Sequence, residues 1–259
     1  MNITILGSGP CAAIPRKGCG CAACGHARKP RSKTKRTRSS ILILKKRHNL
    51  LIDCGPDFLE QAAREKIKKI DAVILTHAHA DAAGGLKKLG EWTKRAVPVY
   101  TEQANFKRIK NLQKLELKNI GLARVKRVGP FKVSAYRVKH GLTSGFPTLG
   151  FKIDNRFGYI SDVGEIPKKN LKYFKNLDLL FLDCAMYFGK KMKGHLNPAQ
   201  AVEYIKILNP QKAVFTQIGH GFPAYAKANR EMQKYWKENK KAIILAGTVP
   251  GLFLLCNSG

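Results

Sequence analysis

The sequence predicts an α/β protein, an αββα sandwich in which two mixed β-sheets are flanked by helices. Short apolar runs bounded by turn residues indicate strands, and amphipathic stretches between several of them indicate helices. The chain has 259 residues, 44% of them hydrophobic, which is enough for a large core, and we expect one domain over residues 1–259. Two helix-covered sheets satisfy the order of the predicted elements, although periodicity alone does not fix the strand order.

The strands are predicted from apolar runs of a few residues that are bounded by turn residues. In chain order they are Ile3–Leu6, Ile41–Leu44, Leu50–Asp53, Ala72–Leu75, Pro98–Tyr100, Val133–Val138, Leu149–Ile153, Gly158–Ile160, Leu179–Leu182, Ala213–Thr216 and Ile243–Leu245. Helical patterns cover Pro56–Lys66, Asn197–Leu208 and Phe222–Glu238. The second helix carries the clearest start signal, because Asn197 can cap it and Pro198 suits its first position.

The charge is strongly positive. Lys and Arg number 48 against 17 Asp and Glu, which gives a formal net charge of +31. Such a field favours a phosphate-bearing small molecule or RNA as partner, whereas a generally solvated basic surface is the alternative, because the lysines are spread along the chain. The densest basic segment is Arg28–Arg47, and a second run lies in Asn105–Lys118.

The N-terminus and the apolar runs bear on location. MNITILGSGP opens with a strand-like run and lacks the basic and apolar regions of a signal peptide. No apolar run approaches the roughly 20 residues needed to span a bilayer. We therefore expect a cytoplasmic protein with no membrane partner. A homodimer is left open, because the sequence does not reveal the oligomeric state.

The seven cysteines do not form a pattern typical of disulfides. Their number is odd and no export signal precedes them, which argues against a disulfide framework. Cys19, Cys21 and Cys24 follow one another closely in a Gly/Ala-rich segment, and this spacing suits a metal site better than free thiols. Cys54 and Cys184 end apolar runs and are expected to be small buried residues.

The strongest chemical signal is the segment Thr76–Ala82, THAHADA, directly after the predicted strand Ala72–Leu75. His77 and His79, two residues apart in a loop, can both bind one ion through ring nitrogens. Asp81 can reach a neighbouring position or hold a water. A pair of surface histidines is the alternative interpretation.

This segment resembles the HxHxDH signature of the metallo-β-lactamase superfamily, and further segments match in order. They are Leu51–Asp57, Lys139–Gly141, Tyr159–Asp162 and Thr216–His220. The resemblance covers nearly the whole chain and implies the metallo-β-lactamase fold. The cysteine-rich segment and Arg36–Ser40 resemble the phosphodiesterase branch of the carbon–phosphorus lyase pathway, which opens phosphoribosyl cyclic phosphate. The pyrroloquinoline quinone biosynthesis protein has a similar cysteine cluster, and tRNase Z is a more distant relative.

The resemblance implies a structural zinc site, Zn²⁺ bound by Cys19, Cys21, Cys24 and His220. Three thiolates and one imidazole form a closed tetrahedral set, which suits structure and not catalysis. His26, two residues after Cys24, is the alternative fourth ligand, but it would not connect distant segments.

The resemblance also implies a catalytic metal centre that departs from the family pattern. The ligands of the first metal are present as His77, His79, His140 and Asp162, whereas Ala82 and Gln217 stand where the family has histidines for a second metal. We expect one catalytic divalent metal, Zn²⁺ or Mn²⁺, with the second weak or absent. Asp81 would orient or deprotonate the attacking water, or hold a weak second ion together with Asp162.

The remaining site residues concern proton transfer and phosphate binding. His195 matches the general acid of the resembling phosphodiesterases, and its alternative role is to pack at the start of the following helix. Arg38, Ser39 and Ser40 are the expected substrate-binding residues, because a guanidinium matches two phosphate oxygens. The expected function is a metal-dependent phosphodiesterase that hydrolyses a small cyclic or ribose phosphate through metal-bound hydroxide. The alternatives are a catalytically degenerate member of the fold and an RNA-binding member, including tRNase Z-like RNA processing.

Overall fold

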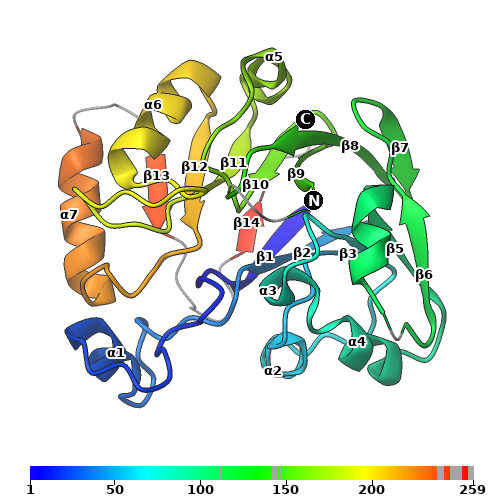
Figure 1. The fold of residues 1–259 in the computed structure, drawn as a ribbon, viewed down its shortest axis with the longest axis horizontal. Coiled ribbons are helices and arrows are strands. Elements are labelled where there is room, and N and C mark those ends of the chain that lie inside the picture. Colours follow the sequence, from blue (N-terminus) through cyan, green and yellow to red (C-terminus); the bar gives the residue numbers. More distant parts are fainter. Residues whose placement is uncertain (111, 142–144, 146, 238–241, 246–252, 256–259) are drawn as a thin grey trace.

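The computed structural model describes residues 1–259 except 111, 142–144, 146, 238–241, 246–252 and 256–259, with side chains described as far as Gln233. Within this part of the chain the strands form two seven-stranded sheets. The sheets lie face to face, and helices cover their outer sides (Figure 1). The αββα sandwich predicted from the sequence is confirmed.

The first sheet has the order β14-β1-β2-β3-β4-β5-β6. Its strands are β1 (Asn2–Gly7), β2 (Ser40–Lys45), β3 (His48–Ile52), β4 (Ala72–Ile74), β5 (Val97–Thr101), β6 (Leu115–Asn119) and β14 (Phe253–Leu255). Strands β14 to β3 pair antiparallel, and β3 to β6 pair parallel. The parallel half therefore presents the carboxyl ends of β3, β4 and β5 at one edge.

The second sheet has the order β13-β12-β11-β10-β9-β8-β7. Its strands are β7 (Val125–Val128), β8 (Phe131–Val138), β9 (Thr148–Ile153), β10 (Phe157–Ile160), β11 (Leu179–Asp183), β12 (Lys212–Thr216) and β13 (Ala242–Leu245). Strands β10 to β13 pair parallel, and β7 to β10 pair antiparallel. Because β8 runs in the same direction as β10, the carboxyl ends of β8, β10, β11 and β12 also share one edge.

Every predicted strand is present, but three further strands were not predicted. β6 (LELKN) and β7 (VKRV) carry charged side chains and are largely exposed, because each lies near the edge of its sheet and needs few apolar residues. β14 is a run of three residues at the edge of the first sheet. The basic run Asn105–Lys118 is divided between the 3₁₀ helix η1 (Gln103–Arg108) and β6.

The predicted helices are also present, with small shifts at their ends. Pro56–Lys66 corresponds to α2 (Phe58–Arg64), Asn197–Leu208 to α6 (Pro198–Leu208), and Phe222–Glu238 to α7 (Tyr225–Lys237); Glu238 lies outside the described residues. Asn197 caps α6 as expected: its Oδ1 accepts from Gln200 N at 3.1 Å in a capping box. The shorter helices are α1 (Ala22–Ala27), α3 (Ala80–Ala83), α4 (Leu86–Trp92), α5 (Lys168–Leu171) and η2 (Lys172–Phe174).

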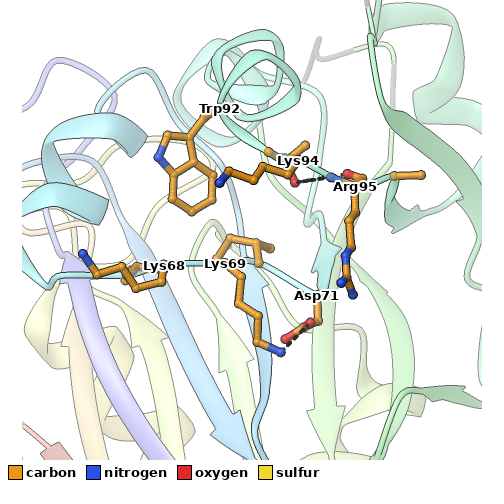
Figure 2. A pocket seen from close by; sticks show the side chains of 10 residues that line it. Lys68, Lys69, Asp71, Trp92, Lys94 and Arg95 are labelled. Atoms are coloured by element: carbon orange, nitrogen blue, oxygen red, sulfur yellow. Dashed lines mark hydrogen bonds and ion pairs between the residues drawn. The ribbon is translucent and has the colours of Figure 1, made fainter.

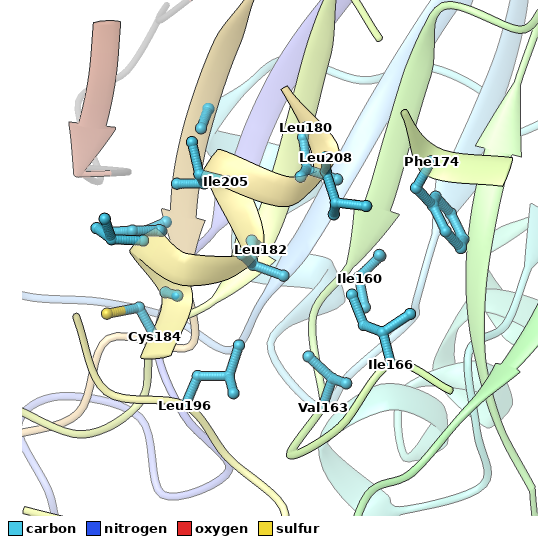
Figure 3. Packing of buried hydrophobic residues seen from close by; sticks show 14 of the residues in the cluster. Ile160, Val163, Ile166, Phe174, Leu180, Leu182, Cys184, Leu196, Ile205 and Leu208 are labelled. Carbon is cyan, nitrogen blue, oxygen red and sulfur yellow. The ribbon is translucent and has the colours of Figure 1, made fainter. Parts of the chain in front are cut away.

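Three layers of buried side chains hold the sandwich together. The central layer joins the two sheets through residues such as Ile43, Leu50, Phe151 and Phe181. A second layer packs α6 onto the outer side of the second sheet, with Ile205 and Leu208 against Leu180 and Leu182 (Figure 3). The third packs α2 and α4 onto the first sheet. Cys54 and Cys184 are fully buried in these layers, as predicted.

The described helices include none that is long and apolar enough to cross a membrane.

Candidate active site and zinc site

Three imidazoles converge where the carboxyl ends of the parallel strands meet. His77 and His79 follow β4, and His140 follows β8. The ring centroids are 4.7 Å apart for His77 and His79, and 5.4 Å for each of the two pairs with His140. Each residue offers one ring nitrogen, and these nitrogens lie within 4.8 Å of one another. The spacing fits three ligands of a single cation.

Hydrogen bonds set the orientation of His77. Its Nδ1 lies 2.8 Å from the hydroxyl of Thr76, and that hydroxyl lies 2.9 Å from Oδ1 of Asp53. Since the Thr76 hydroxyl donates to the carboxylate, it accepts from Nδ1–H, and Nε2 of His77 keeps its lone pair for a ligand. Burial lowers the pKa of His77 to about 3, so the ring is neutral at physiological pH. A neutral imidazole is the form that binds a metal.

His140 is held in the same tautomer by a backbone carbonyl. Its Nδ1 donates to the oxygen of Gly194 at 2.9 Å, which leaves Nε2 facing the other imidazoles. The contact requires glycine, because Gly194 has φ +89° and a Cβ there would lie 2.4 Å from the backbone nitrogen of Gly141. His140 and the loop before α6 are therefore fixed against each other.

Asp162 follows β10 and faces both the imidazoles and β12. Its Oδ1 lies 3.9 Å from Nε2 of His140, within reach of a common cation. Its Oδ2 accepts hydrogen bonds from Ser161 Oγ at 2.9 Å and from Gln217 Nε2 at 2.6 Å. One carboxylate oxygen therefore faces the three histidines, while the other is occupied by two neutral donors.

Asp81 lies beside these groups on the short helix α3. Oxygens of Asp81 and Asp162 and a nitrogen of His77 lie within 4.8 Å of one another. Burial, reinforced by the charge of Asp162, raises the pKa of Asp81 to about 6. Ala82, the next residue, is buried and offers no ligand atom. The position next to the three histidines therefore has two carboxylates but lacks the second set of imidazoles.

His195 is joined to a buried carboxylate that the sequence analysis did not identify. Its Nδ1 lies 2.6 Å from Oδ2 of Asp183, the last residue of β11. Oδ1 of Asp183 accepts from the backbone nitrogens of Leu196 at 3.0 Å and Ala185 at 3.1 Å. Burial alone would lower the pKa of His195, but the charge and hydrogen bond of Asp183 outweigh it and raise the pKa to about 9. The ring is therefore protonated at neutral pH.

The protonated ring points into the site. Its centroid lies 4.8 Å from that of His140, and one nitrogen lies within 4.8 Å of ligand atoms of both His140 and Asp162. A signal for Asp183 was present in the sequence, because an acidic residue that ends an apolar strand lies at the edge where the other site residues meet.

The cysteine cluster meets His220 and not His26. Nδ1 of His220 lies 3.4 Å from Sγ of Cys19 and 3.5 Å from Sγ of Cys21, and Cys24 completes a set whose atoms lie within 4.8 Å of one another. A hydrogen bond from the backbone of Cys24, with one from His220, lowers the pKa of Cys21 to about 6. The donor set fits a closed Cys₃His zinc site. His26 instead contacts Ser32 and Thr34, each at 3.3 Å.

The three predicted phosphate-binding residues differ in their exposure. Arg38 is partly exposed; its guanidinium pairs with Asp57 at 2.8 Å and donates to the carbonyl of Cys11 at 2.7 Å. The hydroxyls of Ser39 and Ser40 are buried and engaged inside the protein. Ser39 Oγ contacts Thr216 Oγ1 at 2.8 Å, and Ser40 Oγ donates to the carbonyl of Asp53 at 2.8 Å. The structure therefore places the two serine hydroxyls within the framework beneath the site.

Arg36 does not belong to the basic surface expected over Arg28–Arg47. It is 3% exposed and donates to the hydroxyl of Ser8 at 2.6 Å. Burial lowers its pKa to about 10. The surface contribution of this segment therefore comes from its other basic residues.

Comparisons with known proteins agree with this geometry. A solved structure described as a new diphosphatase from the PhnP family superposes with a TM-score of 0.85 and 29% identity, over 99% of this chain and 98% of that chain. An octanoyltransferase of Porphyromonas gingivalis is 32% identical over 241 residues, 87% of this chain and 47% of that protein. Ribonuclease Z of Methanopyrus kandleri is 28% identical over 128 residues, 46% of this chain and 44% of that protein. The matches thus span about half the length of these curated relatives.

A family model described as a beta-lactamase superfamily domain matches residues 48–218, which hold His77, His79, His140, Asp162 and His195. With this match and the fold, the chain belongs to the β-lactamase superfamily and has the metallo-β-lactamase fold of the PhnP-like branch.

Proposed function

We propose that the protein is a metal-dependent phosphodiesterase that hydrolyses a small cyclic or ribose-linked phosphate. The observation that carries the proposal is the meeting of three imidazoles, one carboxylate and the imidazolium of His195, in overlapping groups whose ligand atoms lie within 4.8 Å of one another. The first four groups suit a divalent cation, and the fifth suits a leaving group that must gain a proton. The likeness to a PhnP-family diphosphatase supports a phosphorylated substrate.

The residues fit one divalent cation, with His77, His79, His140 and Asp162 as its ligands. When bound, such a cation lowers the pKa of water and withdraws charge from a phosphoryl oxygen. Zn²⁺ and Mn²⁺ both suit three imidazoles and a carboxylate. The Cys₃His cluster is proposed to hold a separate structural Zn²⁺ that joins residues 19–24 to the loop after β12.

In the proposed reaction, the oxygen of a water forms a bond to phosphorus and the bond from phosphorus to the leaving oxygen breaks. Asp81 accepts or orients the proton of the attacking water, since with a pKa of about 6 it is a carboxylate at neutral pH. His195 donates its proton to the leaving oxygen, and Asp183 keeps the imidazolium in place. The two groups therefore have opposite protonation states at the same pH, as acid–base catalysis requires.

Binding of the phosphate falls to Arg38 in this proposal. Its guanidinium is partly exposed and is held by Asp57, and its Cβ and the carbonyl of Asp81 both lie against Gly55, so it is oriented before the substrate arrives. The buried hydroxyls of Ser39 and Ser40 support the backbone around it. We expect Arg38 to contribute to substrate affinity and the two serines to contribute to stability.

The test combines metal analysis with a substrate panel. Purified protein is assayed against cyclic ribose phosphates, linear phosphodiesters, diphosphates and RNA with a 3′ extension. His77→Ala with His79→Ala should abolish both the catalytic metal and turnover, whereas His48→Ala, outside the site, should change neither. Turnover retained in the double variant would contradict the mechanism.

A second candidate is RNA processing. It is favoured by the match to Ribonuclease Z and by the net charge of +31. Cleavage of the RNA substrate in preference to every small phosphodiester would select it, and the catalytic residues would keep the same roles. A protein that binds metal only at Cys₃His and cleaves nothing in the panel would instead be the catalytically degenerate member of the fold.

A further inference from the structure

A basic pocket lies at the edge of the first sheet opposite the candidate active site (Figure 2). It has a volume of about 690 Å³ and is formed by residues 67–71, which precede β4, and 92–96, which precede β5. These segments stand at the amino ends of two parallel strands, whereas His77 follows the carboxyl end of β4. The stretch from Asp71 to Thr76 places roughly 15 Å of extended chain between the two sites. The volume lies within the range of small-molecule sites.

Positive charge dominates this pocket. Lys68, Lys69, Lys94 and Arg95 line it against a single acidic residue, Asp71. Asp71 is already paired with Lys69 at 2.9 Å and accepts from the backbone of Asn49 at 2.8 Å. Among the described residues the side chains of Lys68, Lys94 and Arg95 form no ion pair. Three exposed cations therefore line a pocket whose net charge is positive.

The pocket also has an aromatic wall. Trp92, the last residue of α4, lines it together with the apolar side chains of Ile67 and Ile70. The indole packs edge-on against Phe58 at a centroid distance of 5.4 Å and is only partly buried, so one part of the ring is anchored and another part is accessible. In Figure 2 the side chain of Lys94 points towards the indole ring, whereas that of Arg95 points towards Asp71.

Two close contacts fix the backbone at the end of α4, on the side of the pocket that carries Trp92. Gly90 lies so close to the turn before β6 that a Cβ there would be 2.1 Å from the carbonyl oxygen of Gln113. The end of α4 is further tied by Lys114, whose Nζ donates to the carbonyl of Thr93 at 3.2 Å. The backbone that carries Trp92, Lys94 and Arg95 is therefore fixed before any ligand arrives, which reduces the entropy lost on binding.

We propose that this pocket binds a phosphorylated nucleoside, with its base stacked on Trp92 and its phosphate held by Lys94 and Arg95. Bases stack on aromatic side chains irrespective of sequence, and guanidinium and ammonium groups supply the phosphate contacts. The ligand is a free nucleotide or one unit of a single RNA strand, since both present the same base and phosphate. The site does not depend on the catalytic metal or on the proposed hydrolysis.

The test follows Trp92 directly in the metal-loaded protein. Trp236→Phe removes the other tryptophan, so that fluorescence reports Trp92, and the protein is titrated with adenosine 5′-monophosphate, ribose 5-phosphate, inorganic phosphate and a short single-stranded oligoribonucleotide. We expect quenching and saturable binding with the mononucleotide or the oligoribonucleotide, and affinity at least tenfold weaker for ribose 5-phosphate. Binding of the oligoribonucleotide alone would identify the RNA strand as the source of the ligand.

Charge reversal then locates the binding. Lys94→Glu with Arg95→Glu should weaken it at least tenfold, while Lys126→Glu with Arg127→Glu on the exposed strand β7, an identical change of charge, should leave it within about twofold. The first pair should leave hydrolysis of a small phosphodiester unchanged, and Arg38→Ala should leave Trp92 quenching unchanged. Equal losses in both charge-reversal pairs, no quenching with any ligand, or equal affinity for ribose 5-phosphate would overturn the proposal.

Discussion

The side-chain amide of Gln217 donates a 2.6 Å hydrogen bond to Oδ2 of Asp162. Gln217 itself is 3% exposed, adopts φ +61°, and has its backbone nitrogen hydrogen bonded to Ser39 Oγ at 3.2 Å. A neutral amide therefore occupies one oxygen of Asp162. Together with Ala82, this contact supports the single catalytic metal of the proposed function.

Restoring the two imidazoles should restore a second catalytic metal. For Gln217→His combined with Ala82→His, we expect one further equivalent of divalent metal per chain, because the amide donor is removed and two nitrogen ligands are added. Metal content after dialysis, measured by atomic emission, checks this. Gln217→Ala, which removes the donor without adding a ligand, is the control. An unchanged metal content in the double variant of a folded protein would show that the amide does not determine the stoichiometry.

Asp183→Asn should reduce kcat and move the alkaline limb of its pH profile to lower pH. Asp183 raises the pKa of His195 to about 9, so the acid form is lost only as the pH rises through that value. Without the carboxylate the pKa falls towards the ordinary value of about 6.5, and the acid form is lost earlier. A bound cation lowers the pKa of His195 in the wild type and in the variant alike. The test is therefore the difference in the position of the alkaline limb between the two proteins.

We expect the loss in kcat for Asp183→Asn to be at least roughly tenfold, within the contribution that general acids make. Asp178→Asn removes the same charge from a partly exposed pair with Arg156 and should leave the profile unchanged. If kcat were lower at every pH but the alkaline limb of the profile stayed at the same pH, Asp183 would have a structural role instead.

Thr76→Val should weaken the catalytic metal site without removing a ligand. The substitution keeps the shape of the side chain but breaks the link between Asp53 and His77, and loss of such a partner costs roughly 10–100-fold in metal affinity. Competition with a chelator measures the affinity. Thr4→Val in β1, away from the site, is the matched control, and equal affinity in both variants would show that the Thr76 hydroxyl does not orient His77.

Cys24→Ser should remove the structural zinc and lower the thermal midpoint. Zinc that joins distant segments contributes to folding free energy, and each kcal/mol lost lowers the midpoint by roughly 2–4 °C in a protein of this size. Calorimetry and zinc content together provide the readout. His26→Ala should change neither quantity; if it did remove the zinc, the fourth ligand would have to be reassigned from His220.

Much of this fold could be predicted because its strands are apolar and buried. The runs that became β2, β4, β11 and β12 are almost entirely buried, so their composition alone indicates them. The exposed strand β7 has the sequence VKRV with three of its four residues exposed, and no periodicity distinguishes such a strand from a loop. Strand order came from the family resemblance and not from the pattern.

In the candidate site, too, some features could be predicted from the sequence and others could not. Histidines with ligand spacing can be recognised in the sequence, and the residues at 77, 79 and 140 converge. The hydrogen bonds that orient the site residues could not be recognised, because they join segments far apart in the chain, as from Asp53 through Thr76 to His77 and from Gln217 to Asp162. Ser39 and Ser40 show the opposite difficulty: their hydroxyls suit phosphate by type, yet both face the interior.

The cysteine cluster has a consequence for synthesis of the protein. Nδ1 of His220 belongs to a residue 201 positions after Cys19, so a growing chain exposes its three thiols long before their imidazole partner leaves the ribosome. Until then the thiols are open to oxidation and to capture of soft metals. Oxidants or scarce zinc during translation would therefore reduce the yield of native protein while leaving molecules that had already folded unharmed.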